Sequence, residues 1–259
     1  MEIALLILIS LAIGFFAAIL GIGGGVILTP ALILLGMETH IAISVSLGGV
    51  VLTSLVSSLE YLRQRLVDLK LALIMIAVSA PGALAGAYLS IETPGTVLEK
   101  MMGLFLLAMA GLMLANMEMK VVDRVLSIER QVKAKDGTKF SYHAHLLFLL
   151  PVGMAAGFAA GLFGIGGGVM IVPSLLLSGI PAQVAVATSS LMVNASADAS
   201  FLTYLAKGEF DLSYLLPIAP ALMIGAYAGA RLSRKVKPAH TKALLACLLV
   251  ILAAMLLLR

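Results

Sequence analysis

Apolar and polar positions along this chain fall into long blocks, in which apolar stretches of about 20 residues recur between short polar or glycine-rich breaks. As a helix rising 1.5 Å per residue, such a stretch can cross the roughly 30 Å core of a bilayer. Two stretches of about ten residues are too short to cross and are predicted to be half-helices. The predicted segments are residues 3–20, 26–35, 41–62, 69–89, 97–117, 146–163, 169–177, 184–205, 212–232 and 242–258.

The short segments follow a motif that occurs twice. Residues 14–30 read GFFAAILGIGGGVILTP, and residues 157–173, which lie 143 positions later, read GFAAGLFGIGGGVMIVP. Each glycine inside a helix costs about 1 kcal/mol relative to alanine, so the two runs predict unwound backbone. Inside a membrane such backbone is tolerated only where protein or a water-filled cavity surrounds it. Glycine-broken segments in two corresponding halves point to the binding site of a transporter.

The repeat continues beyond the glycines, because Ser46, Tyr61 and Asp68 pair with identical residues 143 positions later. Residues 1–117 and 145–259 are therefore predicted to be two copies of one transmembrane unit. Each unit is a glycine-broken helical hairpin followed by three transmembrane helices, which makes an all-α integral membrane protein. The hydrophilic linker at 118–144 is expected to be a solvated surface loop, with a regulatory or partner-binding segment as the alternative.

Composition supports the membrane assignment. The chain is 61% hydrophobic and 12% charged, with a mean hydropathy of +1.12, whereas soluble domains carry about 25% charged residues. The net charge of +4 suits a membrane surface better than nucleic acid. The single cysteine, Cys247, rules out a disulfide framework. The first 20 residues lack a basic region and a cleavage site, so no cleaved signal peptide is predicted.

Loop charges predict an inverted arrangement of the halves. In the first half the loop at 63–70 is basic and the loop at 92–95 has no Lys or Arg. In the second half this reverses: the loop at 207–211 holds Lys207 with two acids, and the next loop is strongly basic. Because positive loops favour the cytoplasm, corresponding loops should lie on opposite sides of the cytoplasmic membrane, with the linker inside. A plain eight-helix count would instead separate the two basic loops. Their residues are Arg63, Arg65 and Lys70, and Arg231, Arg234, Lys235, Lys237 and Lys242.

The predicted half-helices begin near Val26 and Val169, directly after the glycines. Their first N–H groups lack intrahelical partners, and the helix dipole adds partial positive charge, so each start can bind an anion. Inversion would bring both starts together near the middle of the membrane. Alternatively the glycines only permit close helix packing, which is the favoured explanation for Gly82, Gly86, Gly225 and Gly229. The predicted substrate-binding glycines are Gly21, Gly23, Gly24, Gly25, Gly164, Gly166, Gly167 and Gly168.

The segments after the half-helices carry hydroxyl and amide groups that can donate to an oxyanion or contact a cation. Many membrane Ser and Thr residues only bond back to their own helix, and this alternative stays open. The predicted binding residues of this kind are Ser46, Thr188, Ser189, Ser190 and Asn194.

Asp198 is the one acid deep inside a predicted span, and its counterpart in the first half is Leu55. Buried acids in membrane segments mark function by default, so Asp198 is a candidate for coupling to a proton or cation. A structural hydrogen-bonded acid and a channel-mouth position are the alternatives.

Signals of catalysis are missing. The four histidines lie near span ends or in the linker, without a metal-binding pattern, and no Lys-Ser/Thr pair follows the glycines as it would in a phosphate loop. No enzyme activity, metal, cofactor or nucleic-acid partner is predicted, and the sequence leaves the oligomeric state open.

The paired motif G-x6-G-I-G-G-G-x4-P resembles the TauE/SafE family of sulfite exporters over nearly the whole chain, most clearly at 14–90 and 157–233. The resemblance implies movement of sulfite, organosulfonates such as sulfoacetate, or related sulfur-containing anions across the membrane. It also gives a site role to the motif glycines and to Pro30 and Pro173. The first copy departs at residues 47–49, so the halves are expected to contribute unequally.

The leading hypothesis is a secondary transporter that works by alternating access around a small anionic substrate, within the lipid bilayer and with a coupling ion still to be identified. An anion channel of the same architecture is the second hypothesis. A membrane scaffold or enzyme subunit that moves nothing is the third.

Overall fold

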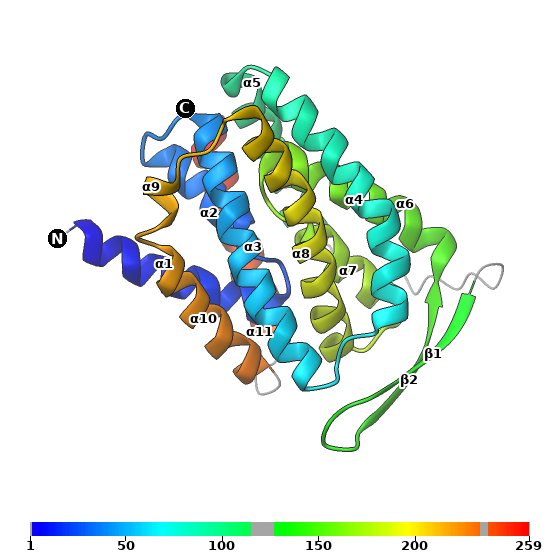
Figure 1. Cartoon of the computed structure of the whole chain (residues 1–259). Helices are drawn as coiled ribbons and strands as arrows, with labels where there is room; N and C mark the ends of the chain where they lie inside the picture. The colour runs from blue at the N-terminus through cyan, green and yellow to red at the C-terminus, as the bar shows by residue number, and fades with distance from the viewer. Residues whose placement is uncertain (1, 115–126, 234–237, 259) are drawn as a thin grey trace.

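A computed structural model describes residues 2–114, 127–233 and 238–258, without the side chains of 2–6, 113–114, 238–246 and 248. The basic residues Arg234, Lys235 and Lys237 lie outside the described residues, as does the side chain of Lys242. The described chain is mainly helical (Figure 1), which confirms an all-α membrane protein.

The helices follow the predicted order. The first half contains α1 (Glu2–Leu20), α2 (Gly25–Leu34), α3 (Thr39–Arg63), α4 (Leu69–Glu92) and α5 (Gly95–Leu114). The second half contains α6 (Leu146–Phe163), α7 (Gly168–Leu177), α8 (Ala182–Lys207), α9 (Leu212–Leu215), α10 (Ala219–Leu232) and α11 (Pro238–Leu257). In both halves a long helix, a glycine break and a ten-residue helix come before the longer helices.

Two features differ from the expectation. The predicted span at 212–232 is divided into α9 and α10, because Pro217 between them lacks the N–H of a helical residue and crowds the preceding turn. Its counterpart in the continuous helix α4 is Ile74. The linker contains an antiparallel hairpin of β1 (Ser127–Lys133) and β2 (Lys139–His145), in place of the expected loop.

Among the described residues, four helices are long and apolar enough to cross a membrane. They are α3, α4, residues 95–112 of α5, and α6. Helices α2 and α7 have ten residues each, about 15 Å, and can reach only part of the way across. Helix α8 has 26 residues, and polar side chains lie in its middle.

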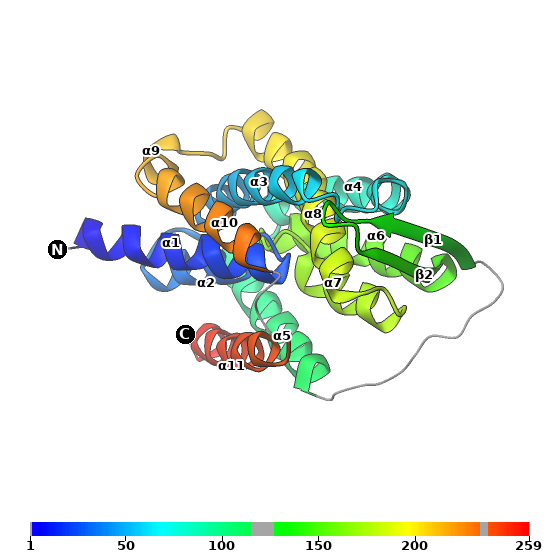
Figure 2. The same cartoon turned by 90° about the horizontal axis from the view of Figure 1, so that it is seen from below.

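The two halves are interleaved, because each long helix packs most extensively on a helix of the other half. The pairs are α4 with α6, α1 with α10, α5 with α11 and α3 with α8, and α8 packs just as extensively on α4. Figures 1 and 2 show α1 beside α10 and, on the other side of the molecule, α4 beside α6. Since α4 corresponds to α10 and α6 to α1, these two pairs are equivalent under the repeat.

Glycines bring the paired helices close together. Side chains at Gly82 and Gly86 of α4 would collide with the backbone of α6, and side chains at Gly225 and Gly229 of α10 would collide with α1. This confirms the packing role predicted for these four residues. The carbonyl groups they approach are those of Met154, Phe158, Leu11 and Phe15, in that order, which differ by the same 143 positions.

Helices α3 and α8 run antiparallel where they cross. Gly48 of α3 lies against Phe201 of α8, whereas Ser54, six residues later in α3, accepts a hydrogen bond from Asn194, seven residues earlier in α8. The repeat therefore relates two antiparallel helices, and inversion follows if both cross the bilayer. The inverted orientation in the membrane stays a prediction.

Contacts at the helix ends lead to a topology test. Gln64, after α3, donates to the carbonyl oxygen of Ala230 in α10 at 3.2 Å, which places the Arg63 and Arg231 loops at one end. The ammonium group of Lys207 lies 5.0 Å from the ring centroid of Tyr88, which places the ends of α8 and α4 together at the other. In a Cys247→Ser background, Arg63→Cys and Arg231→Cys should react with an impermeant thiol reagent from the cytoplasmic side only.

Glu92→Cys and Lys207→Cys should react from the outside only. Labelling of Arg63→Cys and Arg231→Cys from opposite sides would exclude the inverted arrangement.

Candidate functional site

The two glycine runs form tight loops between α1 and α2 and between α6 and α7. Gly24 and Gly167 precede the half-helices with φ angles of +90° and +76°, a left-handed conformation that side chains rarely adopt. The helix ladders begin with the N–H groups of Ile27 and Met170, which donate to Gly24 and Gly167 at 3.0 and 3.1 Å. The N–H groups before these are the donors that a helix start leaves without intrahelical partners.

The two loops lie directly on each other. A side chain at Gly25 would collide with the carbonyl oxygen of Gly164, and a side chain at Gly168 would lie 2.6 Å from the carbonyl oxygen of Gly21. These contacts correspond under the repeat. The glycines of both runs are buried, so the half-helix starts meet inside the protein, as the anion-site hypothesis requires.

Two of the predicted binding hydroxyls hold these loops. Ser46 in α3 donates to the carbonyl oxygen of Gly164 at 3.1 Å, and its counterpart Ser189 in α8 donates to that of Gly21 at 2.8 Å. Each hydroxyl therefore fixes the glycine loop of the other half. Thr29 adds a bond to Gly164, again at 3.1 Å.

The other predicted polar residues also have protein partners. Thr188 accepts from the N–H of Asp68 at 3.1 Å, Ser190 donates to Val186 one turn earlier, and Asn194 donates to Val51 and Ser54. In this conformation they are satisfied without substrate, so a substrate-binding role for them stays a prediction.

Asp198 differs from these residues. Its side chain is half-buried and has no hydrogen bond or ion pair within the part of the chain that the structure describes. Ser190, Asn194 and Asp198 are spaced by four residues and so share one face of α8.

The motif prolines lie within the half-helices, Pro30 in α2 and Pro173 in α7. Each lies six residues after the glycine that precedes its half-helix, Gly24 or Gly167. A proline there removes one bond of the helix ladder.

Val50 and Val193 are site residues that the sequence analysis did not single out. They correspond under the repeat and are fully buried where α3 and α8 cross. A Cβ atom at Gly23 would lie 2.9 Å from a Val50 methyl and 2.6 Å from a Val193 methyl; at Gly166 the distances would be 2.9 and 3.1 Å. The two valines therefore cover both glycine loops. Both copies of the repeat have valine at this position, and this match is the feature of the sequence that could have identified the two residues.

A second polar cluster lies where the linker hairpin covers the loop between α3 and α4. Asp68 is almost fully buried and accepts hydrogen bonds from Arg130 Nε at 2.9 Å, from the Tyr142 hydroxyl at 2.6 Å and from the N–H of Leu71 at 3.1 Å. A second guanidinium nitrogen of Arg130 bonds the other carboxylate oxygen, which makes the pair bidentate.

The charge state of Asp68 follows from this environment. Burial opposes ionisation, but the bonds from Arg130, Tyr142 and Leu71 outweigh it and hold the pKa of the Asp68 carboxyl below its usual value. Because the folded-state pKa is depressed, the carboxylate contributes stability above an unfolded pKa of about 4. That contribution is lost as the pH falls through the folded pKa, so the cluster stays intact at physiological pH.

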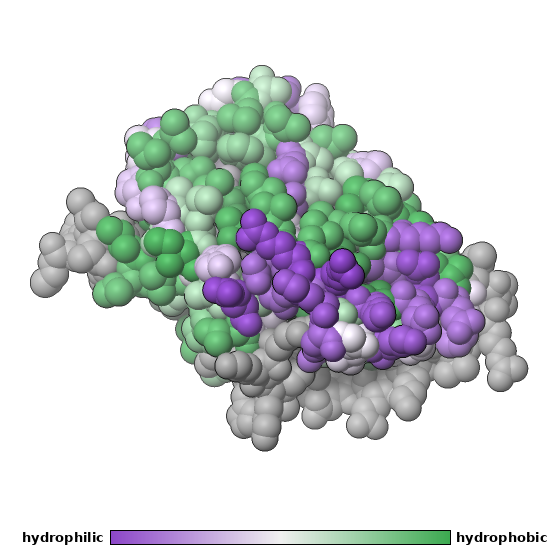
Figure 3. Space-filling view, turned by 60° about the horizontal axis from the view of Figure 1, so that its bottom comes forward, coloured by the Kyte–Doolittle hydropathy of each residue, from purple (hydrophilic) through white to green (hydrophobic). Residues whose placement is uncertain are grey.

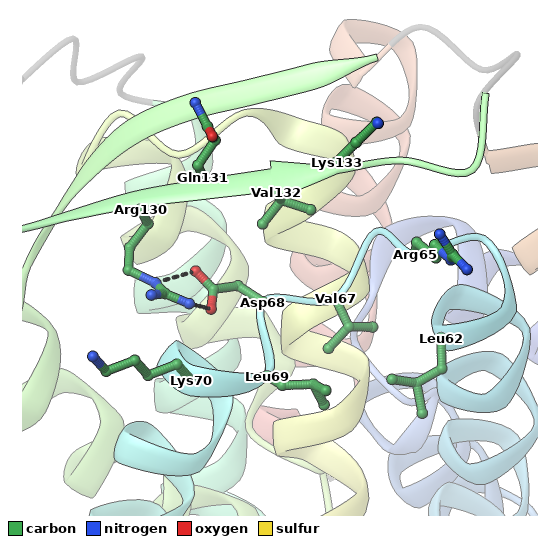
Figure 4. A pocket seen from close by; sticks show the side chains of 10 residues that line it. All are labelled: Leu62, Arg65, Val67, Asp68, Leu69, Lys70, Arg130, Gln131, Val132 and Lys133. Atoms are coloured by element: carbon green, nitrogen blue, oxygen red, sulfur yellow. Dashed lines mark hydrogen bonds and ion pairs between the residues drawn. The ribbon is translucent and has the colours of Figure 1, made fainter. Parts of the chain in front are cut away.

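A surface cleft of about 440 Å³ adjoins this cluster. Figure 4 shows that Arg130 points to Asp68, whereas Arg65 and Lys133 point away from it. Figure 3 shows hydrophilic residues gathered at the hairpin end of the molecule, with an apolar surface beyond them.

The glycine-broken half-helices, the apolar long helices and the polar crossing of α3 and α8 are typical of a multi-pass membrane transporter. A sequence model of the family described as sulfite exporter TauE/SafE matches residues 6–256. The chain therefore belongs to this family, whose members are membrane transporters rather than enzymes.

Named relatives agree. The chain is 28% identical over 247 residues to the probable membrane transporter protein YunE of Bacillus subtilis, covering 92% of this chain and 90% of that protein. It is 25% identical over 270 residues to a probable membrane transporter protein of Methanocaldococcus jannaschii, covering 98% and 95%. The sulfite exporter TauE/SafE family protein 6 of Arabidopsis thaliana is 41% identical over 80 residues, 31% of this chain and 19% of that protein. No solved structure matches the chain.

Proposed function

We propose that this protein is a secondary transporter of a small sulfur-containing anion, such as sulfite or an organosulfonate, in the cytoplasmic membrane. The observation that carries the proposal is the reciprocal contact of Gly25 with Gly164 and of Gly168 with Gly21. It brings two half-helix starts together inside a protein of the TauE/SafE family. Two such starts can hold an anion through N–H groups and helix dipoles, without a lysine or arginine in the site.

The closed loops fit one stage of an alternating-access cycle. Substrate can reach the half-helix starts only if the two loops and the covering valines Val50 and Val193 move apart, because all of these are buried. The contacts of the two glycine loops correspond under the repeat, so the protein can open in two equivalent ways, one toward each face of the membrane. Opening on one side at a time would move the anion across the bilayer.

Flux measurements test the proposal. Purified protein in liposomes should move labelled sulfite, thiosulfate or sulfoacetate with saturable kinetics, and a pH gradient should accelerate the movement if protons are coupled. Electrogenic flux that neither saturates nor responds to a gradient would indicate an anion channel instead. Absence of flux for all three anions, together with a stable protein partner, would favour a scaffold.

A further inference from the structure

The linker hairpin is joined to the first glycine loop by an unbroken series of short polar contacts. Its two strands place Arg130 and Tyr142 directly opposite each other, so both side chains lie on one face. That face covers the loop before α4, where both residues bond the carboxylate of Asp68. Apolar residues of the same face, including Val132, pack in one buried cluster with Leu71 of α4.

The series continues through the backbone of Asp68. Its N–H group donates to the hydroxyl oxygen of Thr188 at 3.1 Å, close to the start of α8. The next residue, Ser189, donates to the carbonyl oxygen of Gly21. Asp68, Thr188 and Ser189 are all buried, so water does not compete for these bonds.

The hairpin tip adds a further tie. The N–H group of Lys135 donates to the carbonyl oxygen of Gln64 at 3.0 Å, and the Gln64 side chain donates in turn to Ala230 of α10. One end of the molecule is thus held together by elements from the linker and from both halves.

The other half has no equivalent series in the part of the chain that the structure describes. Asp211 corresponds to Asp68, but its side chain is exposed and bonds only Ser213, two residues later. Val45 corresponds to Thr188 and has no hydroxyl. Ser46 holds the Gly164 loop without further support from a hairpin. The series that runs from Arg130 and Tyr142 through Asp68 and Thr188 to Ser189, which we call the clamp, therefore breaks the symmetry of the repeat.

Building on the proposed function, we infer that Asp68, Arg130, Tyr142 and Thr188 are positioning residues that fix the Gly21 loop and hold the hairpin face of the transporter closed. The two equivalent openings would otherwise have similar free energies. A clamp on one face shifts the population toward the state that is closed on that face.

Hydrogen exchange of the full-length protein in lipid nanodiscs tests the clamp without requiring transport. The amides of Gly21 and Ile22 are bonded to Ala18 and Ala17, so they report opening of this loop. Arg130→Gln and Thr188→Val should each raise the exchange of these two amides about tenfold, because each leaves a buried polar partner unsatisfied. The exchange of Gly164, bonded to Ala160, should not change.

Matched variants separate positioning from general loosening. Thr188→Ser keeps the acceptor oxygen and should exchange like the wild type. Gln131→Ala, next to Arg130 but exposed, and Asp211→Asn, the exposed counterpart of Asp68, should also leave both loops unchanged. Unchanged exchange in Arg130→Gln and Thr188→Val, or an equal rise at Gly21 and Gly164, would overturn the inference.

The transport assay provides a second readout. Arg130→Gln should lower the KM for anion presented to the hairpin face by about two- to tenfold and raise it on the opposite face by a smaller factor, because the minor state gains proportionally more population than the major state loses. An equal loss of rate from both faces with unchanged KM would contradict the clamp. If liposomes show no flux at all, the proposed function fails, and the exchange experiment still decides whether the clamp exists.

Discussion

Gly25→Ala is expected to reduce anion transport by about 5- to 150-fold, the range that follows from an overpacking cost of about 1–3 kcal/mol. The added methyl group would collide with the carbonyl oxygen of Gly164 and come within 2.9 Å of the Ile165 Cα atom. Both are backbone atoms and cannot turn aside as a side chain could. The two half-helix starts would be forced apart, and the N–H groups predicted to hold the anion would no longer converge.

Initial rates of anion uptake into liposomes, at matched protein content, measure this effect. Gly168→Ala is the equivalent variant in the second half, and it should lose transport to a similar extent because its methyl group would meet the Ile22 Cα atom at 2.5 Å. Thermal unfolding in detergent shows whether each variant still folds.

Gly36→Ala is the matched control. Gly36 has a φ of +91°, so alanine strains the backbone there, but a Cβ atom would meet nothing within 4 Å. It should cost stability and leave transport nearly unchanged. Wild-type transport by Gly25→Ala, or an equal loss in Gly36→Ala, would show that close contact of the loops is not required for function.

The repeated glycine motif made the central part of the fold predictable from the sequence. The cost of adjacent glycines in a helix predicts a break, and the ten apolar residues that follow predict a half-helix. Because the motif occurs twice at one spacing, the break at Gly24 also predicts the break at Gly167. These inferences use only local backbone preferences, and α2 and α7 begin and end close to the predicted residues.

Contacts between the halves were not predictable in the same way. The hydroxyls of Ser46 and Ser189 were recognised as donors, but the carbonyls they bond lie 118 and 168 residues away in the chain. The positions of hydroxyl residues in a sequence do not show which way the hydroxyl groups point, so an anion and a backbone oxygen were equally good acceptors. In this conformation the interleaving of the halves places each hydroxyl beside a backbone carbonyl of the other half, and that carbonyl is the acceptor.

The hairpin had a local signal that was missed. Asp136 and Gly137 form a turn between segments in which apolar and polar residues alternate, which is typical of a β-hairpin. Its attachment had no such signal, because Arg130 and Asp68 are separated by 62 positions and nothing in either segment indicates the other.

Asp198→Asn is expected to keep anion transport but to lose its acceleration by a pH gradient. An ionised acid in a membrane span is unfavourable by about 2.5–3.5 kcal/mol on insertion scales unless a partner or water compensates. Asp198 has no such partner in the described part of the chain. It lies five residues from Val193, about 7.5 Å along the α8 axis, and therefore close to the glycine loops.

This distance makes coupling physically reasonable. An anion at the half-helix starts repels an ionised carboxylate, so anion and proton should bind more tightly together than separately. Asparagine has nearly the shape of the protonated acid but cannot ionise. The ratio of flux with and without the gradient should therefore fall to about one in Asp198→Asn, while the ratio in Asp198→Glu stays above one.

Leu55→Asn is the matched control, because it places the same amide at the corresponding position of α3. It should keep the gradient response of the wild type, since the titrating carboxylate is still present. An unchanged gradient response in Asp198→Asn would show that Asp198 does not carry the coupling proton. A response lost equally in Leu55→Asn would attribute the effect to a polar group near the crossing rather than to the charge of the acid.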